Sequence, residues 1–345
     1  MKTINESEKS IPVMAETDVL VVGSGPSGLS AALASAREGV RTLLVERFGC
    51  FGGNITQSMV GTIAWYRTEN AIDAGGLGVE FETRAAEMGA CLDDHQERGA
   101  LLDTDMFKYV ADQMVLKAGI VPLLHCLIVD VIMEGDKVVG VVTEGKSGRQ
   151  AILAKQVIDA TGDADLAFRA GAPYWKEPKN EMMGVTTSFG CSNVNVEEFL
   201  AYIKENPPSL GDWAKETTGK EDDLFSPFIA DPFQKAMEAG EMPEGSTVLG
   251  YWGGLTDAGE ATHINVAHTL EIDATDVWDL TKAEMDGRQK SLWAIAALKK
   301  YTPGFQNARL RSFNSSLGTR ESRKIVGAYI LKVQQALKNQ NVRIE

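Results

Sequence analysis

The chain has 345 residues, of which 44% are hydrophobic and 24% are charged. That balance is ordinary for a globular protein, and the length suits about two domains or one large domain with an insertion. Lys and Arg number 34 against 48 Asp and Glu, so the net charge is −14. An acidic chain argues against general nucleic-acid binding, because phosphate contacts need clustered cations.

Several other classes of protein lack their usual sequence signature here. The four cysteines form no C-x-x-C pair, and no H-E-x-x-H pattern is present, so we expect neither a metal site nor a dithiol redox centre. No apolar run approaches the ~20 residues of a membrane-spanning helix. The polar N-terminus has no signal-peptide core. We therefore expect a cytoplasmic protein without a membrane span.

The N-terminal part of the chain predicts a β-α-β unit. Residues 1–15 read as a mobile tail, and the apolar run TDVLVV at 17–22 is typical of a strand buried on both faces of a parallel sheet. Glycine-rich residues follow, and the Ala- and Leu-rich segment 29–38 predicts a helix that stops at Gly39. The segment RTLLVE at 41–46 completes the unit as a second strand.

The remaining elements divide at about residue 171. Before it, the pattern predicts a helix from Asp103 or Thr104 to Lys117, a β-hairpin region at 123–153, and a buried strand at 155–160. After it the chain becomes more polar and irregular. The expected elements there are strands at 183–192, 248–252 and 262–270, and one long helix from a Thr281 cap to Lys300.

The spacing Gly23-x-Gly25-x-x-Gly28 follows a predicted strand and opens a predicted helix. In a dinucleotide-binding loop, the first glycine makes the turn, the second admits the pyrophosphate, and the third lets helix and sheet pack closely. Glu46 ends the next strand, where an acidic side chain accepts hydrogen bonds from a ribose. The expected contact residues in these two segments are Gly23, Ser24, Gly25, Pro26, Ser27, Gly28, Glu46 and Arg47.

Three features favour FAD over NAD as the dinucleotide. Glu46 is followed at once by the glycine-rich segment GCFGGN at 49–54, where a plain NAD domain usually continues to a crossover helix. A second strand ends in Ala160-Thr161-Gly162-Asp163, and a β-hairpin region lies between the two. A nicotinamide-dependent Rossmann dehydrogenase remains the less favoured alternative.

At these residues the sequence resembles the FAD-dependent oxidoreductases of the two-dinucleotide-binding-domain flavoprotein class, and especially the family related to the heterodisulfide-reductase flavin subunit. The matching stretches are DVLVVGSGPSGLSAALASAREG, LLVERFGCFGGN, VIDATGDADLAFRAGAP and GTRESRKIVGAY. The resemblance implies FAD as cofactor. It also implies flavin contacts from Gly52, Gly53, Asn54, Ala160, Thr161, Gly162 and Asp163, and an adenine contact from the Ile128 backbone.

The same resemblance implies the domain organisation. We expect an α/β fold with a Rossmann-like FAD-binding domain at 16–170, an inserted α+β substrate domain at 171–319, and a return helix toward the FAD-binding domain at 320–345. Relatives continue beyond this point with a strand and a glycine-rich helix that close around the flavin. We therefore expect loose FAD binding by this chain. The alternative function is that of an incomplete or partner-dependent flavin-binding chain, which has no activity on its own.

The expected activity is hydride transfer between a small-molecule substrate and flavin N5. The catalytic candidates are His263, as a proton donor or acceptor, and Arg320, as a group that orients an anionic substrate or the flavin O2 edge. A structural histidine and a helix-start ion pair with Glu321 are the alternatives for these two residues. Electrons reach or leave the flavin through the substrate, an electron-transfer partner or a carrier, and a homo-oligomer is compatible with the sequence.

Overall fold

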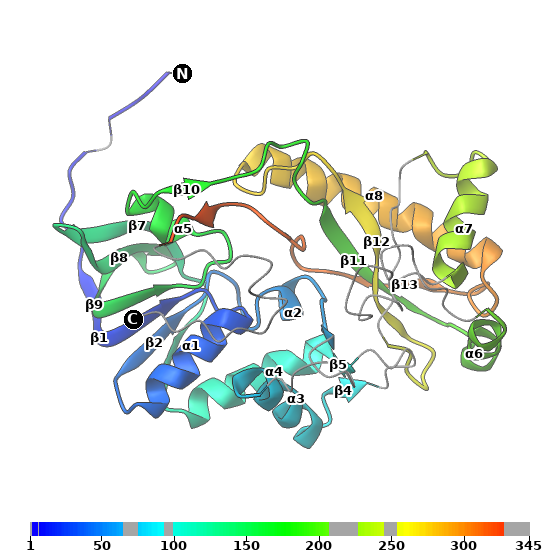
Figure 1. The fold of residues 1–345 in the computed structure, drawn as a ribbon, viewed down its shortest axis with the longest axis horizontal. Coiled ribbons are helices and arrows are strands. Elements are labelled where there is room, and N and C mark those ends of the chain that lie inside the picture. The colour runs from blue at the N-terminus through cyan, green and yellow to red at the C-terminus, as the bar shows by residue number, and fades with distance from the viewer. Residues whose placement is uncertain are drawn as a thin grey trace.

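The computed structural model describes residues 2–5, 7–64, 75–92, 99–206, 227–244 and 254–327. Two groups of elements make up this structure (Figure 1). A six-stranded sheet with helix α1 (Pro26–Arg37) lies at one end, and a three-stranded sheet with the long helix α8 (Val277–Tyr301) lies at the other. The short helix α2 (Asn54–Gln57) lies between them.

The six-stranded sheet has the order β6-β2-β1-β9-β8-β7. β6, β2, β1 and β9 run parallel, while β8 and β7 extend the sheet as an antiparallel meander. This arrangement confirms the predicted α/β fold with a Rossmann-like sheet. In sheet order the strands are Val121–Leu123, Thr42–Val45, Val13–Val22, Gly148–Asp159, Lys137–Gly145 and Leu127–Glu134.

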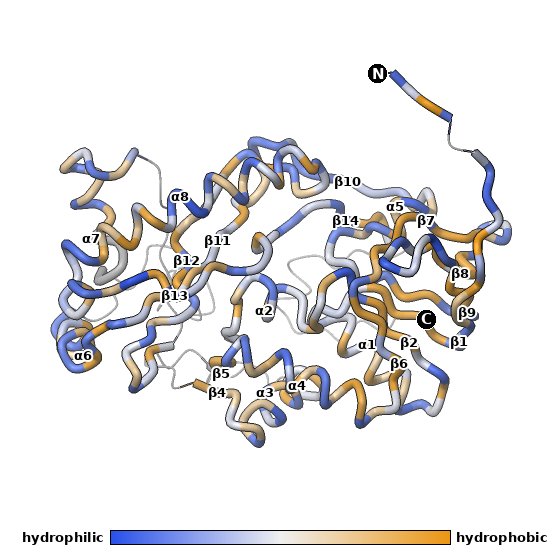
Figure 2. Tube along the Cα trace, turned by 180° about the vertical axis from the view of Figure 1, so that it is seen from behind, coloured by the Kyte–Doolittle hydropathy of each residue, from blue (hydrophilic) through white to orange (hydrophobic). Residues whose placement is uncertain are grey.

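Helices α1 and α4 (Thr104–Lys117) cover one face of this sheet, and α3 (Leu77–Glu87) packs against these two helices. α1 begins with Pro26, whose fixed φ suits the first helical turn, and continues with Ala and Leu residues that favour helix. On the other face, buried side chains of the parallel strands pack with the β7–β8 meander and with α5 (Asp165–Arg169). Figure 2 shows the strands as predominantly hydrophobic segments, as expected for a sheet covered on both sides.

A small antiparallel sheet in the order β3-β5-β4 adjoins α3 and α4. Its strands are Thr62–Ala64, Gly99–Leu102 and Cys91–Leu92. α4 follows β5 directly, and its N-cap residue Asp103 accepts hydrogen bonds from the backbone N–H groups of Asp105 and Met106. This cap is one of the two predicted alternatives for the start of the helix.

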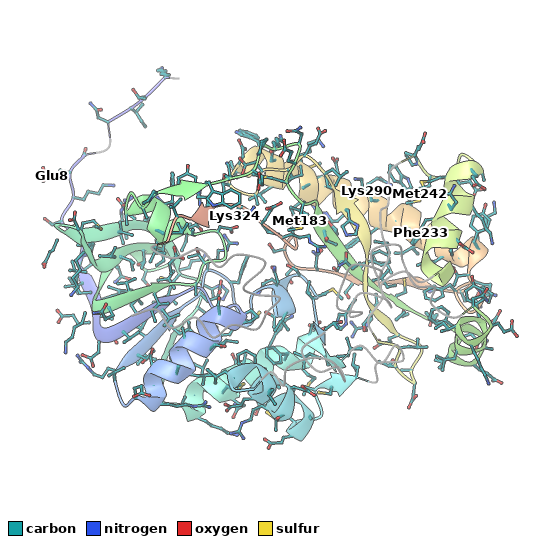
Figure 3. The ribbon with its side chains drawn as sticks, in the orientation of Figure 1. Glu8, Met183, Phe233, Met242, Lys290 and Lys324 are labelled. Carbon is teal, nitrogen blue, oxygen red and sulfur yellow. The ribbon has the colours of Figure 1, made fainter. Side chains whose placement is uncertain are left out.

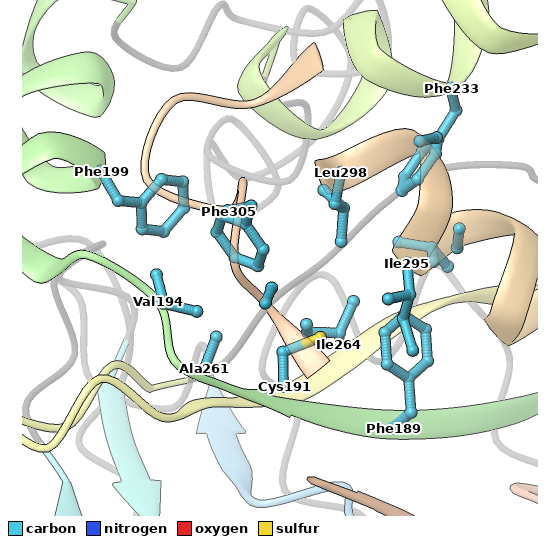
Figure 4. Close-up of a cluster of buried hydrophobic side chains, with 14 of the residues drawn as sticks. Phe189, Cys191, Val194, Phe199, Phe233, Ala261, Ile264, Ile295, Leu298 and Phe305 are labelled. Carbon is cyan, nitrogen blue, oxygen red and sulfur yellow. The ribbon is translucent and has the colours of Figure 1, made fainter. Parts of the chain in front are cut away.

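The second large sheet has the order β12-β11-β13, with strands Ala261–Thr269, Val185–Ser192 and Arg309–Phe313. Helix α8 packs on one face of it, and α6 (Val196–Glu205) and α7 (Pro227–Glu238) pack alongside. Figure 4 shows the resulting core, in which Phe189 and Ile264 of the sheet meet Ile295 and Leu298 of α8. The predicted domain bounds of 16–170 and 171–319 stay a prediction.

Some predicted boundaries differ from those observed. β1 begins at Val13, so part of the predicted N-terminal tail belongs to the sheet. α8 begins at Val277 because Asp276, and not Thr281, caps it by accepting hydrogen bonds from Trp278 and Asp279 N–H groups. Thr281 instead donates its hydroxyl to the Val277 carbonyl inside the helix. The predicted strand at 248–252 lies outside the described residues.

Residues 314–326, which we call the crossing segment, run from β13 back to the six-stranded sheet (Figure 1). The segment ends in β14 (Lys324–Ile325), which pairs with β10 (Tyr174–Trp175). The predicted return helix at 320–345 is therefore wrong for residues 320–327, because Lys324 and Ile325 find a strand partner there. The remainder of the predicted helix, 328–345, lies outside the described residues.

Three further findings concern the described residues alone. None of their helices is both long and apolar enough to cross a membrane. They contain no group of three or more His, Cys, Asp or Glu side chains arranged to hold a metal ion. All four cysteines are free thiols.

Candidate functional site

A cleft opens at the carboxyl ends of β1, β2 and β9, where parallel α/β sheets usually bind ligands. It encloses about 1040 Å³ of space, part of it open to solvent. We call it the dinucleotide cleft. Its walls are Val22, Gly23, Ser24, Gly25, Pro26, Ser27, Val45, Glu46, Arg47, Phe48, Gly53, Asn54, Gln57, Ser58, Cys126, Leu127, Ile128, Ala160, Thr161, Gly162, Asp163, Asp165, Ser316, Leu317 and Thr319.

The three glycines of the loop after β1 have different surroundings. Gly23 has a φ of +90°, and a Cβ there would lie 2.3 Å from the Ala160 carbonyl oxygen. A Cβ on Gly28 would lie only 1.8 Å from the Gly23 carbonyl oxygen, so this glycine permits the close packing of helix on loop. At Gly25, by contrast, the nearest atom is the Gly53 Cα at 3.9 Å, and the residue borders the cleft. Gly25 therefore leaves room for a ligand.

The first turn of α1 points toward this space. Gly25 is the N-cap residue, and no side chain caps the helix. The first N–H groups of a helix have no intrahelical partner and carry the positive end of its dipole. Ser27 belongs to this turn and lines the cleft. The turn is therefore suited to bind a pyrophosphate.

Glu46 lies at the end of β2 and is only 5% exposed. Its Oε2 atom accepts hydrogen bonds from the Ser24 backbone N–H (2.9 Å) and hydroxyl (2.6 Å), and its Oε1 atom accepts one from the Phe48 N–H (3.0 Å). A carboxylate offers about four acceptor positions. About one position remains for a hydroxyl in the cleft, which fits the predicted contact with a ribose.

The loop after β2 passes close over the glycine-rich loop. Gly53 has a φ of +54°, and a Cβ there would lie 2.5 Å from the Gly25 Cα. Gly52 N–H donates to the Ser24 carbonyl oxygen at 2.9 Å, which joins the two loops. Asn54 Nδ2 donates to the Thr319 carbonyl oxygen at 3.1 Å and so connects this loop to the crossing segment.

The turn after β9 supplies a third wall. Asp159 accepts hydrogen bonds from the Thr161 N–H and hydroxyl, at 3.0 and 2.7 Å, and thereby fixes the turn. Asp163 accepts a hydrogen bond from the Ser322 hydroxyl at 2.7 Å, and Arg323 donates to the Asp163 carbonyl oxygen at 2.9 Å. Burial raises the pKa of the Asp163 carboxyl, an effect that the Ser322 hydrogen bond opposes.

Arg323 also forms an ion pair with Asp165 at 2.8 Å. Glu321 pairs with Lys324 and accepts a hydrogen bond from the Met183 N–H at 2.7 Å. Figure 3 shows Met183 and Lys324 on neighbouring segments between the two sheets. The crossing segment is thus held at several points beside the cleft.

The cleft reaches from β2 to the crossing segment, and its parts suit the parts of FAD. Cys126, Leu127 and Ile128 form an apolar wall near Glu46 that suits an adenine ring. The first turn of α1 suits the pyrophosphate. The other end of the cleft lies between α2 and the crossing segment, where Gln57 and Leu317 line it. The residues present therefore fit a long dinucleotide that spans from β2 to the second sheet.

Most of the predicted cofactor residues line this one cleft, and two do not. Gly28 and Gly52 lie behind the walls, where they hold the loops together. The remaining predicted residues line the cleft: Gly23, Ser24, Gly25, Pro26, Ser27, Glu46, Arg47, Gly53, Asn54, Ile128, Ala160, Thr161, Gly162 and Asp163. Their contacts with a bound cofactor stay a prediction.

The two predicted catalytic residues are not among the residues that line the cleft. His263 is 2% exposed, and its Nε2 atom lies 3.2 Å from the Thr104 hydroxyl. Burial lowers the pKa of this imidazole to about 4. This buried and paired environment favours the alternative prediction that His263 is a structural histidine and not a catalytic one. Arg320 is exposed and directly follows Thr319, at the end of the cleft near the second sheet.

Sequence reasoning missed the far end of the cleft. Gln57 and Ser58 follow the GGN loop, and the Gln57 carbonyl oxygen accepts hydrogen bonds from Ser315 and Ser316 N–H groups at 2.8 and 3.1 Å. The Ser58 hydroxyl donates to the Leu317 carbonyl oxygen at 3.0 Å. No sequence motif indicates a contact between segments that are more than 250 residues apart. The one usable signal for this end of the cleft was the GTRESR stretch, which contains residue 319 of the cleft wall.

Comparison with known proteins places the chain among flavoproteins. Residues 18–343 match the profile of the family described as FAD dependent oxidoreductase. Thiamine thiazole synthase of Methanococcus maripaludis strain C5 is 32% identical over 187 residues, which are 49% of this chain and 63% of that protein. The tRNA uridine 5-carboxymethylaminomethyl modification enzyme MnmG of a Nitratiruptor species is 30% identical over 158 residues, 42% of this chain and 24% of that protein.

The chain thus spans less than two thirds of the length of these curated relatives. Among solved structures, that of CabE, an aromatic hydroxylase from angucycline biosynthesis, shares the fold with a TM-score of 0.51 and 13% identity. That match covers 91% of this chain and 54% of CabE. The narrower resemblance to the heterodisulfide-reductase flavin subunit stays a prediction.

Proposed function

Because the chain belongs to the FAD-dependent oxidoreductase family, we propose that it binds FAD in the dinucleotide cleft and that a small-molecule substrate exchanges a hydride with the flavin N5 atom. One observation supports this proposal above the others. A single cleft is lined at one end by Glu46 and the first turn of α1, and at the other end by Leu317 and Thr319 beside the second sheet. Cofactor and substrate can therefore meet at the boundary between the two sheets.

Different residues of this chain bind different parts of the cofactor. The first turn of α1 holds the pyrophosphate, Glu46 accepts a hydrogen bond from the adenosine ribose, and Ile128 contacts the adenine. Asp163 and Asn54 contact the ribityl and flavin part of the cofactor. The bound flavin supplies two-electron oxidation or reduction of a substrate carbon. The protein's own contribution is to orient the substrate and to limit the access of water.

The substrate side of the site is formed by the crossing segment and the second sheet. The Asn54 and Ser58 side chains bond to the crossing segment and thereby fix its position against α2. The substrate exchanges electrons with the flavin in one half of the reaction. In the other half, the flavin exchanges electrons with a diffusible carrier or a partner protein. The location of the protein in the cytoplasm also belongs to this proposal.

Titration of FAD with the purified chain tests the cofactor site, because quenching of flavin fluorescence reports binding even when FAD exchanges rapidly. We expect saturable binding of one FAD per chain and a protein-bound flavin spectrum. Binding of NADH with no binding of FAD would overturn the assignment. For the hydride step, deuterium at the reacting carbon of a substrate should slow anaerobic bleaching of the bound flavin, and the absence of an isotope effect on the isolated chemical step would argue against it.

A further inference from the structure

The face of the second sheet that points away from α8 carries polar side chains. Ile264 and Val266 of β12 pack in the core against α8, so Asn265 between them points to the opposite face. The Thr187 hydroxyl faces Gly287 of α8, and its neighbour Thr186 therefore points away from that helix. His268 is the cross-strand partner of Thr186 and shares its face.

Two polar atoms on this face are buried and unsatisfied. Asn265 Oδ1 and His268 Nδ1 have no hydrogen-bond partner within the described part of the chain. A buried polar atom without a partner costs about 1–3 kcal/mol, so native structures rarely keep one without a reason. A bound ligand that donates a hydrogen bond would satisfy the Asn265 oxygen. His263 on the same strand differs, because its ring already has the Thr104 hydroxyl as a neighbour.

This polar face adjoins the far end of the dinucleotide cleft. Thr186 exchanges backbone hydrogen bonds of 3.1 and 2.9 Å with Gly318 of the crossing segment. A Cβ on Gly318 would lie 3.5 Å from the Ser58 Cβ and 3.7 Å from the Thr186 Cβ. Ser58 lines the cleft, as do Leu317 and Thr319 on either side of Gly318. Thr186 therefore pairs with the residue between two residues of the cleft wall, and His268 is the cross-strand neighbour of Thr186.

The charges around His268 favour an anion. Burial lowers the pKa of His268 to about 4, a hydrogen bond with the Val266 backbone opposes the shift, and the positive charges of Arg320 and Lys290 add to it. Lys290 donates to the His268 carbonyl oxygen at 2.7 Å. Arg320 is exposed and has no hydrogen-bond or ion-pair partner among residues that the structure describes. Among the charges acting on the pKa of Lys290, the Asp286 carboxylate raises it and Lys282 lowers it.

We propose that this face binds the substrate as a small carboxylic acid that also carries a hydroxyl group. Arg320 pairs with the carboxylate, and the hydroxyl group lies between Asn265 Oδ1 and His268 Nδ1. The hydroxyl donates its hydrogen to Asn265 Oδ1, and the neutral imidazole of His268 donates its one N–H from Nδ1 to the hydroxyl oxygen, in place of its hydrogen bond with the Val266 backbone. His268 is thus a positioning group for the hydroxyl. This inference rests on the proposed function, because it places the substrate at the flavin end of the dinucleotide cleft.

Three matched probes test the two halves of this proposal. Lactate has both groups, propionate lacks the hydroxyl, and 1,2-propanediol lacks the charge. Calorimetric titration of the chain, with and without bound FAD, should give the tightest binding for lactate, about tenfold weaker binding for propionate, and no measurable binding for propanediol. Lactate binding without FAD binding would support this site while refuting the cofactor assignment, so the two failures are distinguishable.

Three variants locate the probes on the sheet. Arg320→Gln should weaken lactate and propionate equally, by about tenfold or more. His268→Gln and Asn265→Ala should weaken lactate to the level of propionate and leave propionate unchanged. Arg309→Gln, an exposed arginine on β13, is the control and should bind lactate as the unchanged chain does. Equal binding of lactate and propionate, binding unaffected by Arg320→Gln, or no binding of lactate in the millimolar range would each overturn the proposal.

Discussion

The two ends of the dinucleotide cleft differ in how their polar groups are satisfied. At the β1–β2 end, Glu46 is buried and already accepts three hydrogen bonds from nearby backbone and side-chain groups. On the face of the second sheet beside the other end, Asn265 and His268 each keep a buried atom without a partner in the described structure. At the first end, groups of the chain itself already pair with the buried carboxylate, so the shape of this end is fixed. For the polar face beside the second end, we propose that a bound substrate supplies the missing partners.

The largest expected effect is a loss of FAD binding, caused by a substitution that fills the β1–β2 end of the cleft. Gly25→Asp places a side chain and a negative charge where the pyrophosphate is expected, and FAD binding should be lost in fluorescence titration. Gly78→Asp adds the same charge at an exposed glycine of α3 with open space around it, and is the matched control. A folded Gly25→Asp protein that keeps its affinity for FAD would show that the cofactor binds elsewhere.

The next largest effect is a pH dependence of stability, which we expect from the two buried histidines of the second sheet and not from solvent-exposed ones. The pKa of His263 falls from 6.5 to about 4 on folding, so between these pH values the unfolded chain binds more protons than the folded chain. Stability should therefore fall as the pH is lowered from about 6.5 to 4, by about 3 kcal/mol for this group. Below pH 4 this group causes no further loss.

Urea denaturation at a series of pH values measures this loss. His268 has a similarly lowered pKa, so His263→Gln should remove about half of the combined pH dependence and His268→Gln the other half. His263→Gln should also leave lactate binding unchanged, since its ring is already paired with Thr104. An unchanged pH dependence in both variants would mean that neither ring is held neutral by burial.

A smaller effect is expected at the ribose end of the cleft. Glu46→Gln keeps the shape of the side chain and removes its charge, so the affinity for FAD should fall by about 1–3 kcal/mol, the range for a charge-assisted hydrogen bond. The flavin spectrum of the saturated protein should stay the same, because the change lies far from the ring. Glu38→Gln, at an exposed position after α1, should leave the affinity unaltered.

The smallest effect concerns helix caps in the two regions. Asp276→Ala at α8 and Asp103→Ala at α4 each remove two hydrogen bonds to backbone N–H groups, and each should lower the free energy of unfolding by about 1 kcal/mol. Asp286→Ala, an exposed ion-pair partner within α8, should stay within about 0.5 kcal/mol of the unchanged chain. A loss at Asp286 equal to that at Asp276 would refute the capping role.

The sequence allowed prediction of the first end because its residues are close together in the chain. Gly23, Gly25, Gly28 and Glu46 have a spacing that one β-α-β unit imposes, and each role follows from local geometry. The second end could not be predicted in this way. Asn265, His268 and Thr186 come from different strands, and two bulges in the β11–β12 pairing decide which side chains share a face.

His263 illustrates the same limit. The sequence places it on a strand two residues from Asn265, and the alternation of a strand brings both to one face. What decides its environment is Thr104 at the start of α4, 159 residues away, and no local pattern indicates that contact. Arg320 was easier to find, since it lies within the GTRESR stretch and adjoins Thr319 of the cleft wall.

The crossing segment has a consequence for the order in which the protein is made. Its residues bond to Gln57, Thr186 and Asp163, so the far end of the cleft lacks one of its walls until residues 315–323 have been synthesised. Contacts over such sequence distances form late, because the chain must first lose the entropy of closing a long loop. During translation the β1-α1-β2 unit can fold before the crossing segment has been made. The far end of the cleft is enclosed only after nearly all of the second sheet has left the ribosome.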